Sequence, residues 1–148
     1  MPLNITAKRP LMTQLPSDFS PPVGVKVYRQ RSVINWYDNN IYHIYALPEV
    51  EHTLEDAKMQ IDLVKKLFGD EKVKVLLDLR KASPISYNAR KYYGTEEGNG
   101  NFVRTSVLVN SSFNKVLANF FMGTIKKSLK TKMFLSVEEA VLWLNRKG

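Results

Sequence analysis

The sequence has no cysteine, only two histidines and no long apolar run. The absence of cysteine excludes disulfide bonds and thiolate chemistry, and it makes a reducing cytoplasm the simplest location. A transmembrane helix needs about 18 or more consecutive apolar residues, and no stretch of the chain approaches that length. Residues 1–10 also lack the charged and then apolar order of a secretory signal. We therefore expect a cytoplasmic protein without a membrane span.

The scarcity of histidine and the missing catalytic motifs argue against an enzyme. His43 falls inside a predicted strand and outside any metal-ligand spacing, whereas a metal site needs three or four convergent ligands. Nucleophilic catalysis needs a serine beside a base, and the sequence contains no G-x-S-x-G motif. The glycines of Gly94–Gly100 do not follow a strand, and acidic residues accompany them, which disfavours a phosphate-binding loop. We predict no catalytic residue, no metal site and no cofactor.

Length and charge set the class of protein and its possible partners. The 148 residues suit one domain, and 44% apolar with 24% charged residues is typical of a globular protein. The net charge of +8 is concentrated near the C-terminus, since from Arg104 onward eight basic residues accompany only two acidic ones. Such a region either forms a solvated basic face or attracts nucleic acid, anionic lipid or an acidic protein. No predicted helix carries clustered arginines, which disfavours nucleic-acid binding.

Residues 1–22 hold five of the seven prolines and show no sustained periodicity. This composition predicts an extended proline-rich arm ahead of one α/β domain over residues 23–148. Arms of this kind are disordered unless something ties them down. We expect its apolar residues to dock on the body or on a neighbouring subunit, and we predict a homodimer in which the arm crosses to the partner.

The next two segments predict a β-hairpin. Val25–Tyr37 and Ile41–Leu47 are rich in Val, Ile, Tyr and Trp, which favour strands. The residues between them, Asp38-Asn39-Asn40, include asparagines that tolerate positive φ, and Pro48 ends the second strand.

A helix and a central strand follow the hairpin. Apolar residues recur at spacings of three and four from Leu54 to Phe68, and Thr53 with Asp56 forms a capping-box pattern at the start. Gly69 ends this helix. Val73–Leu79 is a nearly continuous apolar run, which is typical of a central strand covered on both faces.

The remaining elements alternate in the same way. They are a helix entered near Ser86, a strand at Thr105–Val109, a helix capped by Ser111 or Ser112, a strand at Lys132–Leu135 and a helix opened by Ser136. This order predicts an α/β fold, a small two-layer sandwich with an N-terminal β-hairpin followed by alternating helices and mostly parallel strands. The hairpin is expected at the antiparallel edge of the sheet.

Several short motifs along roughly residues 30–146 carry a family resemblance. They are Asp78-Leu79, Ala89-Arg90-Lys91-Tyr92, Ser106–Asn110, Asn119-Phe120-Phe121, and Phe134 with Glu139-Ala140 and Trp143-Leu144. With this layout the chain resembles the STAS or SpoIIAA-like fold of anti-sigma factor antagonists. It is most similar to uncharacterised bacterial STAS-like proteins, mainly from Bacteroidetes. The resemblance implies a regulatory or binding module without known enzymatic activity.

The resemblance also implies a phosphorylation switch, because such antagonists are phosphorylated on a serine at the start of the helix after the central strand. By position that serine is Ser86, with Ser83 as the second candidate. The antagonists carry Asp-Ser-Ser-Gly there, whereas this chain has Ser83-Pro84-Ile85-Ser86. A helix N-terminus stabilises added negative charge, but a serine there also acts simply as a cap.

Four further side chains are candidates for binding a partner or ligand: Asp78, Arg80, Tyr87 and Arg90. Asp78 and Arg80 lie two residues apart on a strand and point the same way, so they either orient a partner or pair with each other. Arg90, one turn into its helix, either reaches an anion near Ser86 or lies on the surface.

We predict a non-enzymatic regulatory or protein-interaction module of STAS-like type that is controlled by serine phosphorylation. It would bind a protein partner through the hairpin edge and the Ser86 region. The alternative is a carrier or sensor that holds a small apolar or anionic ligand between the helices and the sheet. Phe113, Phe120 and Phe121 either line that pocket or fill the core.

Overall fold

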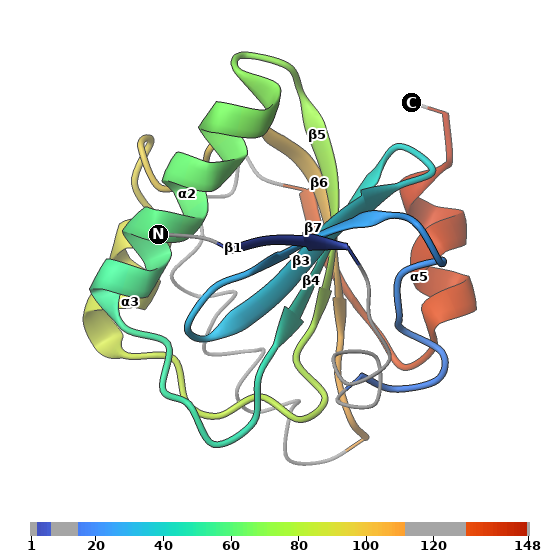
Figure 1. Cartoon of the computed structure of the whole chain (residues 1–148), viewed down its shortest axis with the longest axis horizontal. Coiled ribbons are helices and arrows are strands. Elements are labelled where there is room, and N and C mark those ends of the chain that lie inside the picture. Colours follow the sequence, from blue (N-terminus) through green and yellow to red (C-terminus); the bar gives the residue numbers. More distant parts are fainter. Residues whose placement is uncertain (1–2, 7–14, 112–129, 148) are drawn as a thin grey trace.

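The computed structural model describes residues 3–6, 15–111 and 130–147, which form one seven-stranded sheet with helices on both faces (Figure 1). The order in the sheet is β1-β2-β3-β4-β5-β6-β7, so each strand lies beside its neighbours in the sequence. The strands are β1 (Leu3–Thr6), β2 (Lys26–Arg29), β3 (Val33–Asp38), β4 (Ile41–Ala46), β5 (Val73–Asp78), β6 (Phe102–Leu108) and β7 (Lys130–Phe134). The described helices are α2 (Leu54–Phe68), α3 (Tyr87–Tyr93) and α5 (Val137–Leu144).

The first four strands pair antiparallel, and β3 with β4 forms the predicted hairpin. Asn39 and Asn40 at its turn have φ values of 52° and 63°, in the left-handed region that asparagine tolerates. The sequence predicts this hairpin at the edge of the sheet, and that prediction is wrong. The hairpin lies inside the sheet, because β2 and β1 add two more strands beyond β3.

The predicted strand Val25–Tyr37 is in fact two strands, β2 and β3. The Gln30 N–H donates to the Val33 carbonyl at 2.9 Å, and Arg31 and Ser32 between them reverse the chain. This turn contains no glycine, proline or asparagine, the strongest turn-forming residues. The apolar residues before and after the turn therefore predict one continuous strand.

The later strands, β4 to β7, pair parallel, and β5 is the central strand that the apolar run predicted. The capping box of α2 is present: Thr53 Oγ1 accepts from the Asp56 N–H at 3.3 Å, and Asp56 Oδ2 accepts from the Thr53 N–H at 2.8 Å. Ser86 and Ser136 cap α3 and α5 as predicted. The α/β fold class, with a hairpin followed by alternating helices and parallel strands, is confirmed.

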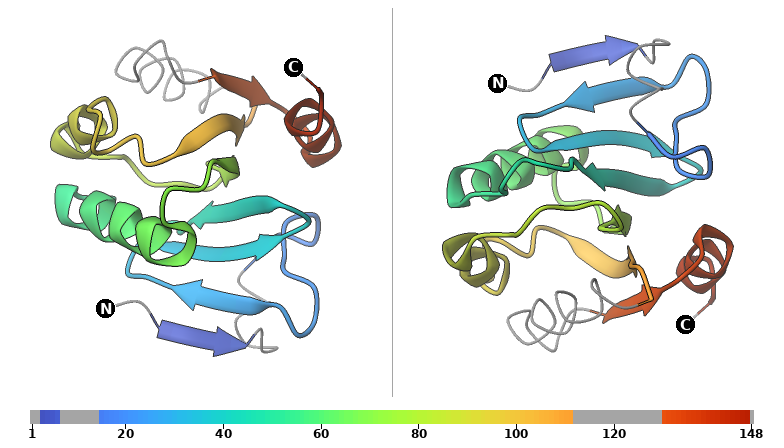
Figure 2. Two further views of the ribbon diagram at one scale, coloured as in Figure 1. Left: turned by 90° about the horizontal axis from the view of Figure 1, so that it is seen from above. Right: turned by 90° about the horizontal axis from the view of Figure 1, so that it is seen from below.

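The two faces of the sheet are covered by different parts of the chain (Figure 2). Right-handed connections between parallel strands that are added in one direction place their helices on one face. In agreement with this rule, α2 and α3, which follow β4 and β5, lie side by side on one face, and α5 lies on the other. The second face therefore depends on segments that are not crossovers.

Each face has its own hydrophobic core. On the α2 side, Val64 packs with Tyr42, Ile44, Val73 and Val75 of the sheet. On the α5 side, a larger cluster joins the helix, the sheet and the N-terminal segment; its buried members include Leu15, Phe19, Val27, Ile34, Trp36, Ile41, Leu76, Leu108, Ala140 and Leu144.

The N-terminal part of the chain is tied to the sheet at two places. β1 pairs antiparallel with β2 of the same chain. Phe19 is only 2% exposed, and its ring lies 5.0 Å from the ring of Trp36 and 5.6 Å from that of His43. Within one chain, residues around Phe19 thus dock on the body and cover the part of the second face that α5 leaves open.

One predicted helix lies outside the described residues. It is the helix capped by Ser111 or Ser112, which carries Phe113, Phe120 and Phe121. The strand predicted at Lys132–Leu135 is β7, which begins two residues earlier. None of the described helices has the length and apolar character needed to cross a membrane.

Phe19 provides a test of this docking. Phe19→Ala is expected to lower the free energy of unfolding by about 3 kcal/mol, because it removes a buried ring and leaves a cavity beside Trp36. Val23→Ala is the matched control, since Val23 is 88% exposed and should change stability by less than about 0.5 kcal/mol. Urea unfolding followed by tryptophan fluorescence measures both; equal effects would show that the segment is not docked in solution.

Candidate functional site

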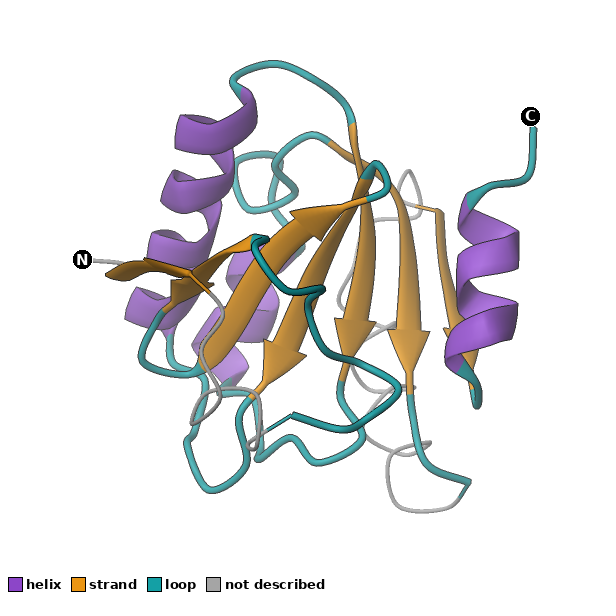
Figure 3. Ribbon diagram, turned by 45° about the vertical axis from the view of Figure 1, so that its right-hand side comes forward, coloured by secondary structure: helices purple, strands orange, loops and turns teal. Residues whose placement is uncertain are grey.

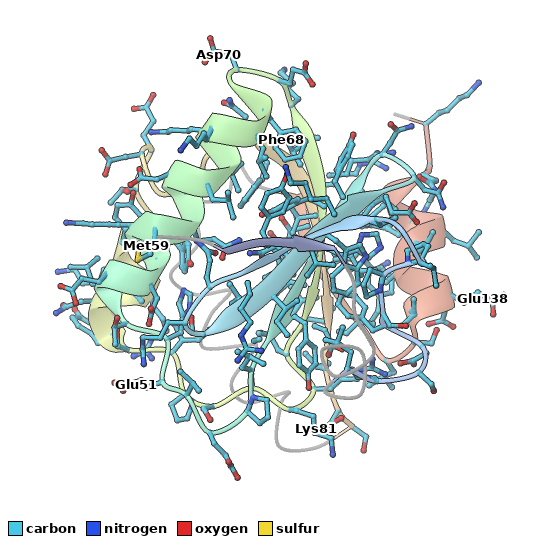
Figure 4. All side chains as sticks on the ribbon, in the orientation of Figure 1. Glu51, Met59, Phe68, Asp70, Lys81 and Glu138 are labelled. Atoms are coloured by element: carbon cyan, nitrogen blue, oxygen red, sulfur yellow. The ribbon has the colours of Figure 1, made fainter. Side chains whose placement is uncertain are left out.

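The parallel strands all point to one end of the molecule, and the residues predicted for binding follow the end of β5 there (Figure 3). Lys81, beside Arg80, marks this end in Figure 4. Asp78 is the last residue of β5, and its side chain is completely buried. The Arg80 N–H and Nε both donate to Asp78 Oδ1, at 2.9 Å and 3.0 Å. Of the two alternatives for these residues, the structure shows the pair.

A second carboxylate, on the N-terminal segment, completes this arrangement. Arg80 Nη1 and Nη2 donate to the two oxygens of Asp18, each at 2.9 Å, while Nη2 also donates to Asp78 at 2.9 Å. The hydrogen bonds that Arg80 donates to Asp18 and then to Asp78 raise the pKa of Arg80, and the Arg80 hydrogen bond lowers the pKa of Asp18. We call Asp78, Arg80 and Asp18 the carboxylate clasp. An anionic ligand at Arg80 would have to displace Asp18.

The other predicted residues lie apart from the clasp, at the start of α3 on the α2 face. Ser86 Oγ accepts from the Ala89 N–H at 3.1 Å, which makes Ser86 the helix cap. Tyr87 is 59% exposed, and the cationic groups of Arg90 and Lys91 lie 5.8 Å and 5.3 Å from its ring centre. Arg90 also donates to the Ile85 carbonyl. The candidate binding residues predicted from sequence are therefore divided between two places, with Asp78 and Arg80 at one and Tyr87 and Arg90 at the other.

A cavity of about 80 Å³ lies on the α2 face of the sheet. Strand residues such as Val33, Ile44, Val75 and Leu77 line it, and Gln60 of α2 and Tyr93 of α3 face it from the helices. Ser83, the second phosphorylation candidate, also lines this cavity. None of the described lining residues is Asp, Glu, Lys or Arg. The cavity is thus apolar, with a few neutral polar groups.

His52 forms the polar end of this cavity together with two hydroxyl groups. His52 Nδ1 lies 2.7 Å from Ser32 Oγ, and its Nε2 lies 2.6 Å from the Tyr93 hydroxyl. The imidazole also stacks on the Tyr93 ring, with 5.7 Å between centroids and 15° between planes. All three residues line the cavity. We call Ser32, His52 and Tyr93 the histidine triad.

Three separate elements bring the histidine triad together. Ser32 lies in the turn between β2 and β3, His52 precedes α2, and Tyr93 ends α3. A β-bridge between His52 and Ile85 holds the two loops, with the Ser86 N–H donating to the His52 carbonyl at 2.9 Å. The sequence prediction missed this site, because its members are 20 and 41 residues apart and follow no local spacing.

Burial keeps His52 neutral. It lowers the pKa of His52 to about 4, while the nearby charges of Asp56 and Arg31 act in opposite directions. Asp56 is engaged elsewhere: its oxygens accept from Arg31 Nε and Nη2 at 3.0 Å and 2.5 Å. His52 thus has two hydroxyl partners and no carboxylate bonded to it. A neutral imidazole in this setting orients hydrogen bonds and is a weak general base.

Metal binding finds no support in the part of the chain that the structure describes. Within residues 3–6, 15–111 and 130–147 no three His, Cys, Asp or Glu side chains gather closely enough to hold a metal ion. His43, the second histidine, lies beside Trp36 with its ring stacked at 5.1 Å, and burial lowers its pKa.

The low pKa of His52 predicts a pH-dependent stability. Between pH 6.5 and pH 4 the unfolded chain binds a proton on His52 that the folded protein does not, so stability falls as the pH is lowered through this range. The loss should reach about 3 kcal/mol from His52, with a further loss from His43 in the same direction. His52→Gln should flatten the profile in urea unfolding between pH 7 and pH 4. Identical profiles for both proteins would contradict a neutral His52.

Comparisons with known proteins give a family but no activity. A crystal structure of an uncharacterized protein from the DUF3478 family with a SpoIIAA-like fold, from Shewanella loihica PV-4, is similar at 17% identity and a TM-score of 0.49, covering 81% of this chain and 91% of that one. A protein with unknown function from Arthrobacter sp. FB24 is 28% identical, with a TM-score of 0.30, over 74% of this chain and 88% of that one. Neither likeness extends to function.

No curated protein matches the sequence. The model of one family, described as a domain of unknown function (DUF7793), matches residues 35–147. This match spans most of the chain and includes most of β3 and all of β4 to β7, α2, α3 and α5. The chain therefore belongs to the DUF7793 family.

Proposed function

We propose that this domain is a non-enzymatic binding module and that its site is the cavity between the sheet, α2 and α3. One observation carries the proposal: an apolar cavity of about 80 Å³ ends at the histidine triad, three convergent polar groups drawn from distant parts of the chain. Apolar cavities with a few converging polar groups are the usual form of small-molecule sites. The domain would act as a carrier or sensor, the alternative that the sequence left open.

Binding fits the triad better than catalysis does. Ser32 is 3% exposed and bonds a histidine that burial keeps neutral. A serine nucleophile needs a base that can accept and hold its proton, and a carboxylate usually stabilises the resulting imidazolium. Here the second partner of His52 is the Tyr93 hydroxyl, whose pKa burial raises. The triad therefore offers hydrogen bonds without a means of stabilising charge.

A cavity-filling substitution tests the proposal. Ala46, at the end of β4, lines the cavity, so Ala46→Leu should abolish binding while costing little stability, since the new side chain fills existing space. A library of small neutral fragments, screened by two-dimensional NMR, should give hits that shift residues around the cavity in the wild type but not in Ala46→Leu.

The matched control is Ala82→Leu, because Ala82 packs near the same strands without lining the cavity. It should keep the hits. Hits that survive Ala46→Leu, or their loss in both variants, would contradict the assignment of the site.

A second candidate function is the STAS-like protein-interaction module with a phosphorylation switch, and one observation favours it. Ser86 opens α3, and the exposed Tyr87 beside it lies against the cations of Arg90 and Lys91. Exposed aromatic residues with arginine are enriched at protein interfaces. Phosphate on Ser86 would add negative charge to this surface, where both cations lie near.

Ser86→Asp is expected to weaken capture of a protein partner, because it adds charge while keeping a good helix cap. Ser86→Asn is the control, since asparagine caps equally well without charge. A quantitative pull-down should show weaker capture of the partner by Ser86→Asp, and unchanged capture by Ser86→Asn and the wild type. Equal capture by all three proteins would end the phosphorylation-switch idea.

The assembly and location complete the proposal. We propose a homodimer, which light scattering would test, although the residues around Phe19 already dock within one chain. The absence of cysteine supports a reducing cytoplasm as the location.

A further inference from the structure

We propose that the cavity selects an uncharged ligand that donates a hydrogen bond, namely a small alcohol or the hydroxyl end of a longer molecule, and that Gln60 Oε1 accepts this bond. The inference rests on the proposed function, because it names the chemical class of ligand for the same cavity. Its basis is a line of three buried amide side chains, from Gln30, Asn35 and Gln60, which are 5%, 0% and 3% exposed.

The three amides are joined by hydrogen bonds that all run in one direction. Gln30 Nε2 donates to the Met59 carbonyl at 3.2 Å. Asn35 Nδ2 donates to Gln30 Oε1 at 3.1 Å, and Gln60 Nε2 donates to Asn35 Oδ1 at 3.1 Å. We call this line the amide relay. It starts at the backbone carbonyl of Met59 in α2 and ends at the neighbouring Gln60, which lines the cavity.

The direction of the amide relay follows from its starting point. A backbone carbonyl can only accept, so Gln30 must present its NH₂ group to Met59 and its oxygen to Asn35. Asn35 Nδ2 also lies 3.4 Å from the Tyr28 carbonyl, which fixes its orientation in the same sense. Turning over any one amide would place two donors or two acceptors against each other. The Gln60 NH₂ group therefore faces Asn35, and Gln60 Oε1 is the last atom of the relay.

Gln60 Oε1 is the one atom of the relay left without a partner in the described structure. A buried carbonyl oxygen without a hydrogen bond is costly, so a group that enters the cavity gains by donating to it. Two more lining side chains hold buried oxygens that lack a partner there, Asn99 Oδ1 and Thr131 Oγ1. Residues that line the cavity thus hold three buried oxygens whose capacity to accept a hydrogen bond is unused.

Charge and size restrict the ligand further. No charged side chain belongs to the described lining, and the buried His52 stays neutral, so an ionised ligand would lose its hydration without meeting a counter-charge. The sequence allows either an apolar or an anionic ligand. The lining favours the uncharged one. A volume of about 80 Å³ is roughly half that of a cavity that holds benzene, which suits a group of a few heavy atoms.

Three probes of one shape separate these requirements: propan-2-ol, acetone and acetate. Propan-2-ol can donate a hydrogen bond, acetone can only accept, and acetate is an anion. NMR titration of the full chain should show propan-2-ol binding about tenfold more tightly than acetone, the effect of one well-placed hydrogen bond, and no saturable binding of acetate. Ala46→Leu should remove the propan-2-ol shifts, and Ala82→Leu should keep them.

Gln60→Met then tests the acceptor itself. Methionine keeps the length of the side chain but lacks the oxygen, so propan-2-ol should lose its advantage over acetone. If this variant does not fold, because Asn35 loses a donor, the comparison of the probes on the wild type decides alone.

The outcomes separate the two proposals. Equal binding of propan-2-ol and acetone, blocked by Ala46→Leu, would overturn the donor requirement and leave the cavity as a binding site. Preferred binding of acetate would overturn the uncharged class. Failure of every probe to bind would overturn both proposals.

Discussion

The handedness of the crossovers is the constraint on which this structure depends. Successive parallel strands joined by right-handed connections put α2 and α3 on one face of the sheet, so the crossovers that the structure describes leave the other face uncovered. That face carries Trp36, Ile41 and Leu76, all of which must be kept from water. The two ends of the chain do this, with α5 on one part and the segment around Phe19 on the other.

The carboxylate clasp follows from the same requirement. Asp78 is buried at the end of the central strand, and a buried carboxylate needs a cation and hydrogen bonds. Arg80 supplies both and uses its remaining donors on Asp18, which stands one residue before Phe19. Neutralising one charge thereby fastens the segment that covers the second face. The α2 face instead contains the cavity, and the polar groups on that face form the histidine triad and the amide relay.

Local patterns in the sequence predict local structure well. They do not predict contacts between residues that are far apart in the sequence. Thr53 with Asp56 and the apolar run of β5 could be recognised because each pattern lies within a few residues. The clasp joins residues 62 positions apart, and the relay from Asn35 to Gln60 spans 25. Only the tertiary fold brings such groups together. The sequence places Asp78 and Arg80 side by side and offers their pairing as one of two alternatives, but nothing nearby in the sequence points to Asp18.

The order of strands in the sheet has a consequence for how the chain folds. Because each strand pairs with its sequence neighbour, every newly made strand finds its partner already present in the chain. The turns of β2–β3 and β3–β4 close small loops at low entropic cost, whereas the parallel pairs close over longer crossovers and form more slowly. The sheet is therefore suited to assembly in step with synthesis, starting from the N-terminus. Arg80 comes after β5, so the Asp18 contact can close only when five of the seven strands have been made.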